Sequence, residues 1–320
     1  MRELVKSKVR AGSKIHRFYS DGFCYIDSSF SRVFPRDYLY IIVCTHSDDL
    51  FGCLEFARSF TTNGYLVLAC LVYPDGAFGV WDSYVYDVLG INKQCSLYKK
   101  GMDIDNLGRM LEIKDAIRVD EFIRMCMAAG INSSYTYNFE FESRLKNAVF
   151  KNVLSSDGSV YTIFNSHESE FDCLDSQESG KIKNYVRNLS KKGKTAWLIQ
   201  NPNTAKHQQH IHSSRAFIDS INSFCPESII FQYNSTVDEA ERTGALAKGS
   251  RAVMLYLNEE RLRINMDNIF QTAKSQNYRY AEMEPNFYGA QYERKTRHYA
   301  CSMYPDPIKG YRHGEYLERI

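Results

Sequence analysis

Two short segments rich in histidine and acidic residues carry the side chains that are best suited to chemistry. Residues 46–49 read His-Ser-Asp-Asp and end a long apolar run. Residues 207–210 read His-Gln-Gln-His, and His212 adds a third imidazole nearby. Imidazole nitrogens and carboxylate oxygens are typical ligands of Zn²⁺, and a carboxylate beside such an ion can act as a base. The residue types therefore indicate a metal centre that activates water, if the fold brings the two segments together.

Each segment also has a simpler interpretation. Ser47, Asp48 or Asp49 could cap a helix that begins here, because their side chains accept hydrogen bonds from unpaired backbone N–H groups. That interpretation accounts for the acids but gives His46 no role. The histidines at 207–212 could likewise be the solvent-exposed start of a helix. Both interpretations are weakened because the two segments occur in one chain, each after a run that is typical of a buried strand.

The elements around these segments predict an α/β fold. Strands buried on both faces read as continuous apolar runs, and three such runs occur at 38–45, 65–73 and 195–200. Apolar residues at helical spacing predict helices at 50–63, 107–129, 181–192 and from about 211 onward, and shorter strands are predicted at 135–141 and 160–165. Each histidine-containing segment thus joins the carboxyl end of a predicted strand to a helix. Open α/β sheets bind their ligands at that edge.

The composition is that of an ordinary soluble globular protein. Hydrophobic residues make up 44% and charged residues 24% of the 320 positions, and the formal net charge is +2. So small a charge argues against nucleic acid or an anionic membrane as a partner. No apolar run is long enough for a transmembrane helix, and the N-terminus lacks the apolar core of a secretion signal. The nine cysteines are scattered without a Cys-x-x-Cys pair, so we expect a reduced, cytoplasmic protein.

A nucleotide-binding enzyme such as a glycosyltransferase is an alternative in the same fold class. It is disfavoured because the sequence has no Gly-x-Gly-x-x-Gly fingerprint. Residues 192–195 read Lys-Gly-Lys-Thr but do not match a phosphate-binding loop, since Asn188 stands where the first glycine is required. Detectable nucleotide binding would be needed to revive this alternative.

Taken together, the two segments resemble the paired motifs of the PIG-L/LmbE-like zinc de-N-acetylases. The family motifs usually read His-Pro-Asp-Asp-Glu and His-Pro-Asp-His, each at a point where a strand ends and a helix begins. Residues 118–121 (Arg-Val-Asp-Glu) are similar to the Arg-x-x-Glu that the family carries before its third strand. If this pattern is considered alone, we favour a surface ion pair between Arg118 and Glu121. Weaker similarities involve Ser275-Gln276 and Tyr292-Glu293.

The resemblance covers roughly residues 38–295. It implies a Rossmann-like, mostly parallel sheet flanked by helices, in a single deacetylase-like domain that spans 1–320. Residues 1–36 are then an N-terminal extension that packs on the sheet. A concentration of turn-forming residues marks 155–180 as a candidate insertion.

The resemblance also implies a mechanism. His46, Asp49 and His210 match three ligands of Zn²⁺ or another divalent metal, with a fourth position open for water. Asp48 matches the general base that activates this water, and His207 matches the residue that stabilises the oxyanion or protonates the leaving amine. The implied reaction removes an acyl group from a small N-acylated amino sugar or sugar conjugate, and acetyl is the acyl group that we expect. The oligomeric state is not indicated.

Several positions depart from the family pattern without removing a metal ligand. Ser47 replaces proline, Leu50 replaces glutamate, and Gln208-Gln209 replaces Pro-Asp. A carboxylate beside an imidazole favours the imidazolium form, so with Gln209 we expect the pKa of His207 to be less raised. These departures leave a second function open, that of a non-catalytic protein of the same fold which binds a sugar-like ligand.

Overall fold

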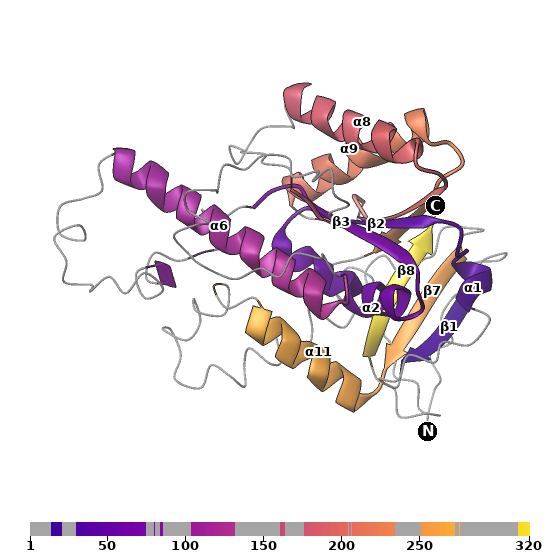
Figure 1. Cartoon of the computed structure of the whole chain (residues 1–320). Helices are drawn as coiled ribbons and strands as arrows, with labels where there is room; N and C mark the ends of the chain where they lie inside the picture. The colour runs from indigo at the N-terminus through magenta and orange to yellow at the C-terminus, as the bar shows by residue number, and fades with distance from the viewer. Residues whose placement is uncertain are drawn as a thin grey trace.

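A mostly parallel sheet with helices on both faces forms the centre of the computed structural model (Figure 1). The structure describes residues 14–20, 30–74, 80, 84–85, 104–131, 161–163, 176–203, 205, 207–233, 251–272, 275 and 313–320. Within these residues the sheet has eight strands in the order β1-β7-β8-β6-β5-β2-β3-β4. Only β8 runs antiparallel to its neighbours, β6 and β7. The predicted Rossmann-like α/β fold is therefore confirmed.

The strands are β1 (Lys14–Ser20), β2 (Leu39–Cys44), β3 (Leu66–Leu71), β4 (Tyr161–Ile163), β5 (Thr195–Gln200), β6 (Ile229–Tyr233), β7 (Arg251–Leu257) and β8 (His313–Arg319). The helices are α1 (Phe30–Val33), the 3₁₀ helix η1 (Ser47–Cys53), α2 (Leu54–Thr62), α6 (Ile104–Ala128), α8 (Ser176–Ser190), α9 (Gln208–Phe224) and α11 (Glu259–Thr272). Within these elements, no helix combines the length and the apolar character that crossing a bilayer requires.

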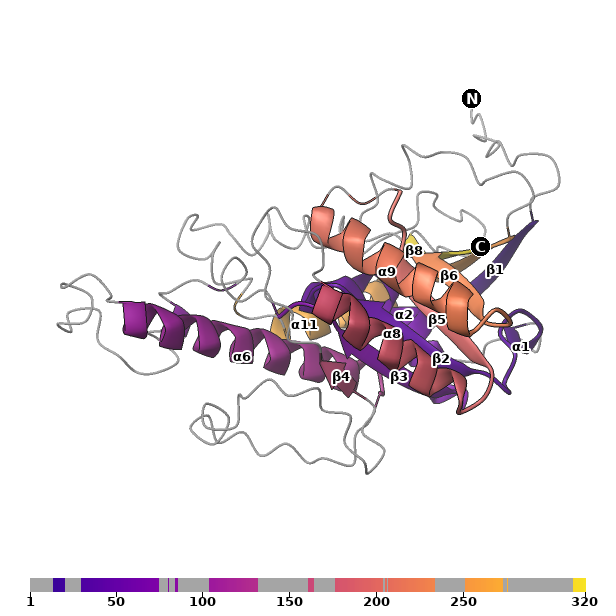
Figure 2. The same ribbon diagram turned by 90° about the horizontal axis from the view of Figure 1, so that it is seen from above.

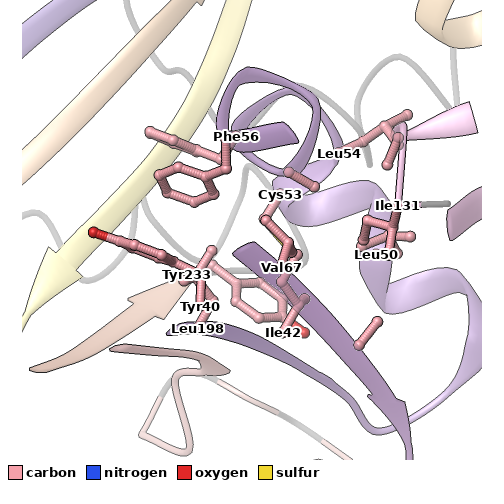
Figure 3. Close-up of a cluster of buried hydrophobic side chains, with 14 of the residues drawn as sticks. Tyr40, Ile42, Leu50, Cys53, Leu54, Phe56, Val67, Ile131, Leu198 and Tyr233 are labelled. Atoms are coloured by element: carbon pink, nitrogen blue, oxygen red, sulfur yellow. The ribbon is translucent and has the colours of Figure 1, made fainter. Parts of the chain in front are cut away.

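The three predicted buried strands are β2, β3 and β5, and they lie side by side as parallel neighbours. Alternate residues of β2 serve opposite faces of the sheet. Tyr40 and Ile42 pack with α2 and α6 in one hydrophobic cluster, part of which Figure 3 shows. Ile41 and Val43 pack with α8 and α9 in the other. Figure 2 looks down on α8 and α9, which cover that second face. Burial on both faces is the reason why the strand reads as a continuous apolar run.

The predicted helices are present with shifted starts. The helix expected over 50–63 begins as the tighter 3₁₀ turn η1 and continues as α2, a common arrangement at helix N-termini. The helix ends next to residue 63, as predicted, and Gly64 has the positive φ of 76° that favours glycine. The helix expected over 107–129 is α6, which ends before Gly130 (φ 74°). A Cβ on Gly130 would lie 2.7 Å from Thr61 Oγ1, so this position also lets α6 approach α2 closely.

The strand predicted at 160–165 is the short edge strand β4, and the helix predicted at 181–192 is the larger part of α8. The strand predicted at 135–141 lies outside the described residues, as does Tyr292-Glu293. Of the candidate insertion, only β4 and the first turns of α8 are described.

Both ends of the described chain belong to the sheet. β1 does not lie on the sheet as a separate extension but pairs with β7 along its full length as a parallel edge strand. β8, near the C-terminus, is inserted between β6 and β7. The expected core of 38–295 leaves out both of these strands.

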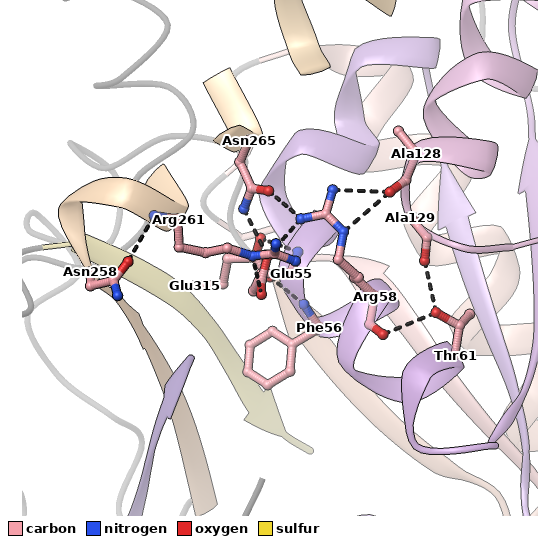
Figure 4. Close-up of polar contacts among 10 residues, drawn as sticks. All are labelled: Glu55, Phe56, Arg58, Thr61, Ala128, Ala129, Asn258, Arg261, Asn265 and Glu315. Carbon is pink, nitrogen blue, oxygen red and sulfur yellow. Dashed lines mark hydrogen bonds and ion pairs between the residues drawn. The ribbon is translucent and has the colours of Figure 1, made fainter. Parts of the chain in front are cut away.

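A buried polar network fixes the start of α2 (Figure 4). The carboxylate of Glu315, on β8, accepts hydrogen bonds from the backbone N–H groups of Glu55 and Phe56 at 2.6 and 2.8 Å. A carboxylate at this position complements the partial positive charge of a helix N-terminus. The side chain of Glu55 in turn accepts from Arg261 Nε at 2.9 Å and Asn265 Nδ2 at 2.8 Å, both on α11. Because η1 runs directly into α2, this network also holds η1 in place.

Candidate metal centre

The two histidine-containing segments leave the carboxyl ends of adjacent strands. β2 and β5 pair in parallel from Leu39↔Thr195 to Ile42↔Leu198. From β2 the chain passes to β3 on one side, whereas β5 and then β6 lie on the other side. This reversal is a topological switch point, at which open α/β sheets form their ligand sites. The fold thus brings together η1 and the start of α9, although they are far apart in sequence.

A contact between two hydroxyl groups joins the two segments next to the histidines. Thr45, the residue before His46, and Ser213, one turn after His210 on α9, contact each other through their Oγ atoms at 2.7 Å. Both side chains are buried. The contact fixes the carboxyl end of β2 against α9. It therefore sets the separation of the neighbouring histidines, His46 and His210.

Three of the residues expected at the site form one compact group. His46, Asp49 and His210 each offer a ligand atom, and these atoms all lie within 4.8 Å of one another. His46 Nδ1 faces His210 Nε2 at 2.9 Å, and Asp49 Oδ1 lies 3.7 Å from His210 Nδ1. His46 and Asp49 are 7% and 5% exposed. Two imidazole nitrogens and one carboxylate match the donor set of a catalytic Zn²⁺, so the residues fit the expected metal.

Local backbone bonding orients Asp49. Its Oδ2 accepts the backbone N–H of His46 at 2.8 Å, and its own N–H donates to the carbonyl of His46 at 3.2 Å. The side chain therefore does make a local contact at the start of a helix, as the simpler interpretation expected. The same contact holds the Asp49 carboxylate beside the two histidines.

The far nitrogen of each histidine meets a glutamine. His46 Nε2 lies 2.6 Å from Gln209 Oε1, and His210 Nδ1 forms a hydrogen bond with Gln200 Oε1. Gln209 was expected to act on His207. In the structure, the first turn of α9 directs Gln209 Oε1 to His46, and the expected effect on His207 stays a prediction.

Burial disfavours the charged forms of His46 and Asp49, the two residues that the first segment contributes to the group. Desolvation lowers the pKa of His46 to about 3, with a smaller contribution from His210. Desolvation likewise raises the pKa of Asp49 to about 6, opposed by the nearby His210. A divalent cation would stabilise the neutral imidazole and the ionised carboxylate, which are the forms that bind metals.

Asp48 has a different environment from its neighbour. Its side chain is 40% exposed, and its Oδ1 accepts a hydrogen bond from Arg118 Nη2 at 3.0 Å. Arg118, on α6, is only 3% exposed and also donates from Nε to the carbonyl of Pro74 at 3.3 Å. Its Nη1 lies 3.6 Å from Glu121 Oε2. The expected i,i+3 ion pair between Arg118 and Glu121 is therefore present, but it is not at the surface, since both side chains are buried and the guanidinium spans α6 and η1. Arg118 is a site residue that sequence reasoning missed, and its only signal was the Arg-x-x-Glu pattern.

His207 lies beside the two histidines of the group. It is the N-cap residue of α9 and is exposed. Its ring centroid lies 5.9 Å from that of His46 and 5.8 Å from that of His210. The structure thus places all five residues expected at the site in one region, with His46 and Asp49 buried, His210 partly buried, and Asp48 and His207 more accessible to solvent.

Comparisons with known proteins find likeness in structure alone. No protein-family profile matches the sequence, and no curated protein is similar to it. The fold resembles that of N,N'-diacetylchitobiose deacetylase from Pyrococcus horikoshii, with a TM-score of 0.52 and 14% identity, over 88% of this chain and 83% of that one. A triple mutant of a deacetylase from the teicoplanin biosynthetic pathway gives a TM-score of 0.48 at 10% identity, over 88% and 98% of the two chains. The zinc-inhibited form of teicoplanin deacetylase gives 0.44 at 10% identity, over 88% and 97%.

Of these three structures, only the N,N'-diacetylchitobiose deacetylase has a TM-score above 0.5, so the comparison rests on it. At 14% identity it establishes a shared fold and nothing finer. The chain therefore has the fold of a deacetylase of the PIG-L/LmbE-like type, and the resemblance that the two sequence motifs predicted is confirmed at the level of the fold.

Proposed function

We propose that this chain is a metal-dependent N-deacetylase that acts on an N-acylated amino sugar or sugar conjugate. The observation that carries the proposal is the grouping of His46, Asp49 and His210 beside Asp48 at the switch point of the sheet. The fold shared with N,N'-diacetylchitobiose deacetylase supports the same reaction class, since that protein is named for removing acetyl groups from an amino sugar.

Zn²⁺ is the cofactor that this donor set favours, although another divalent ion carries the same charge and can use the same ligands. When bound, such an ion supplies Lewis acidity, which polarises a carbonyl group and makes water a stronger acid. His46, Asp49 and His210 would hold the ion, and three protein ligands leave room for water and substrate.

The remaining residues have roles in moving protons. Asp48 accepts a proton as water attacks the amide carbon, and the guanidinium of Arg118 stabilises the ionised carboxylate that this role requires. The new C–O bond forms while the carbonyl π electrons move onto oxygen. His207 donates a hydrogen bond to that oxygen or a proton to the departing nitrogen. Cleavage of the C–N bond then releases a carboxylic acid and a free amine.

The setting of the reaction is also a proposal. Among the described cysteines, Cys44, Cys70, Cys126 and Cys225 are buried thiols that form no disulfide. Free thiols are typical of a reducing compartment, and we propose a cytoplasmic protein that acts on small molecules.

Metal content and acetate release test the proposal together. Purified protein is assayed against N-acetylglucosamine, N,N'-diacetylchitobiose and glycoconjugates that carry an N-acetyl group. We expect about one equivalent of metal per chain and acetate release from at least one substrate. His210→Ala removes a ligand and should lose both, whereas Gln208→Ala changes an exposed neighbour and should keep both.

Two outcomes contradict the proposal in different ways. A chain that binds no metal and releases no acetate has no hydrolytic centre. A chain that binds metal and sugar but hydrolyses no amide is the non-catalytic binding protein that the departures at Ser47 and Leu50 left open.

A further inference from the structure

The two histidines of the metal centre are arranged as a matched pair. Each imidazole directs one ring nitrogen at the other ring, with 2.9 Å between His46 Nδ1 and His210 Nε2. Each directs its second nitrogen at a glutamine oxygen, Gln209 Oε1 for His46 and Gln200 Oε1 for His210. Every ring nitrogen of the pair therefore has a defined partner on the chain.

Metal binding places a strict demand on such a ring. A neutral imidazole has one N–H and one lone pair, and only the nitrogen with the lone pair can bind a cation. In a buried site the remaining N–H needs an acceptor, and the acceptor decides which tautomer is present. His46 is 7% exposed and Gln200 is 2% exposed, so water cannot readily replace these contacts.

We propose that Gln200 and Gln209 are positioning residues that fix the tautomers and ring orientations of the two histidine ligands. The carbonyl oxygen of Gln209 accepts the Nε2–H of His46 and leaves the lone pair on Nδ1. The carbonyl oxygen of Gln200 accepts the Nδ1–H of His210 and leaves the lone pair on Nε2. In the metal-loaded protein both lone pairs would then be available to one ion. The inference rests on the proposed metal centre and names the residues that prepare it.

One strand–loop–helix unit supplies most of this arrangement. Gln200 is the last residue of β5, and Gln209 precedes His210 in the first turn of α9. Gln200 holds a ligand from its own segment, whereas Gln209 reaches across to the ligand on the first segment. Gln209 therefore couples the two halves of the site directly.

Neutral amides in these positions have an electrostatic consequence. A carboxylate that accepts from a metal-bound histidine raises the basicity of that ligand, and an amide does so less. Asp49 is the single anionic ligand of the group. Replacing Gln209 with glutamate adds a negative charge next to the ion and should tighten metal binding.

Metal affinity and histidine tautomers test the inference. Zn²⁺ affinity is measured by competition with a chromophoric chelator for the wild type, Gln200→Leu, Gln209→Leu and Gln209→Glu. The leucine variants remove the acceptor at similar volume and should bind zinc 10- to 100-fold more weakly. Gln209→Glu should bind more tightly than the wild type. Gln208→Leu, on the exposed side of the same helix turn, is the matched control and should not change the affinity.

Nitrogen-15 NMR of the zinc-loaded wild type gives a readout that a merely structural role would not produce. We expect an Nε2–H tautomer for His46 and an Nδ1–H tautomer for His210. Opposite tautomers, or leucine variants with wild-type affinity, would overturn the inference. If the leucine variants do not fold, the tautomers and the affinity of Gln209→Glu still decide it.

These readouts separate the inference from the proposed function. Tautomers and affinities as expected without acetate release support the positioning role and contradict the deacetylase. Acetate release with leucine variants that keep wild-type affinity supports the deacetylase and contradicts the positioning role.

Discussion

Adjacent carboxylates in this chain have separate environments. Asp49 is 5% exposed and lies within the group that could hold a metal, whereas the side chain of Asp48 is 40% exposed and pairs with Arg118. A residue that binds a cation benefits from a dry site, and a residue that exchanges protons with water needs access to it. In the proposed mechanism, the His-Ser-Asp-Asp segment thus provides one carboxylate for each task within a single turn.

Asp48→Asn tests this division. The amide keeps the shape and a hydrogen-bond acceptor for Arg118 but cannot accept a proton from water. We expect kcat for acetate release to fall by roughly 10²- to 10⁴-fold, the usual contribution of a general base, with the metal content unchanged. Loss of the metal would instead make Asp48 a ligand, and unchanged kcat would remove it from the mechanism.

Arg118→Lys tests the missed site residue. Lysine keeps the charge but lacks the planar fork with which the guanidinium contacts both Asp48 and the carbonyl of Pro74. Misplacing the base should lower kcat by about tenfold to a hundredfold while zinc affinity stays constant. Arg124→Lys is the control, since Arg124 pairs with Asp120 one turn away on the same helix and is 42% exposed. Equal effects of the two variants would contradict a role for Arg118 in placing Asp48.

The stability of metal-free protein should report the burial of Asp49. Its pKa is about 6 in the folded chain, against about 3.9 in the unfolded chain, so the folded state binds more protons between these values. The ionised carboxylate therefore destabilises the metal-free fold, and this cost appears as pH rises from about 4 to about 6. His46, whose lowered pKa acts in the opposite direction, obscures the effect in the wild type alone.

Asp49→Asn isolates the contribution, because asparagine does not ionise. In the presence of a chelator the variant should become more stable than the wild type by on the order of 3 kcal/mol as pH rises through this window, measured by urea unfolding. Saturating zinc should reverse the order, since the variant has lost a ligand. A stability difference that does not depend on pH would show that Asp49 ionises normally in the fold.

Among the elements, those that position the site were the easiest to predict. β2, β3 and β5 are covered on both faces and therefore read as apolar runs, and the polar residues that end β2 and β5 stand out against them. β8 reads His-Gly-Glu-Tyr-Leu-Glu-Arg, and this pattern gave no clear strand signal. Its buried Glu315 accepts hydrogen bonds from backbone N–H groups of α2, which are remote in sequence. A charge that the tertiary fold neutralises cannot be recognised as a core residue from local pattern.

Glu315→Ala tests the coupling between β8 and the site. The substitution removes the acceptor for two buried N–H groups at the start of α2, and we expect a loss of roughly 2–3 kcal/mol in the free energy of unfolding. Glu318→Ala, on the same strand and only partly buried, should cost less. Equal losses, measured by urea unfolding, would mean that the contact with α2 contributes nothing specific.

At the scale of the whole molecule, the site forms because β2 and β5 are adjacent parallel strands at the switch point of the sheet. Their carboxyl ends bring the two segments together. Described strands from Lys14 to Arg319 join one sheet, and the single domain over 1–320 stays a prediction. His46, Asp49 and His210 could be predicted because they lie in the two polar segments that join the carboxyl ends of β2 and β5 to the following helices. Gln200 could not, since it ends a buried apolar strand, and the Arg-x-x-Glu pattern of Arg118 did not indicate its contact with Asp48. Their roles depend on packing between distant segments.

Anomalous diffraction from crystals grown with zinc, recorded on both sides of the zinc absorption edge, tests the central claim most directly. We predict one strong anomalous peak per chain, in contact with His46, Asp49 and His210 together. A peak elsewhere on the chain, or none in crystals that contain zinc, would contradict the claim that the two segments form one metal centre.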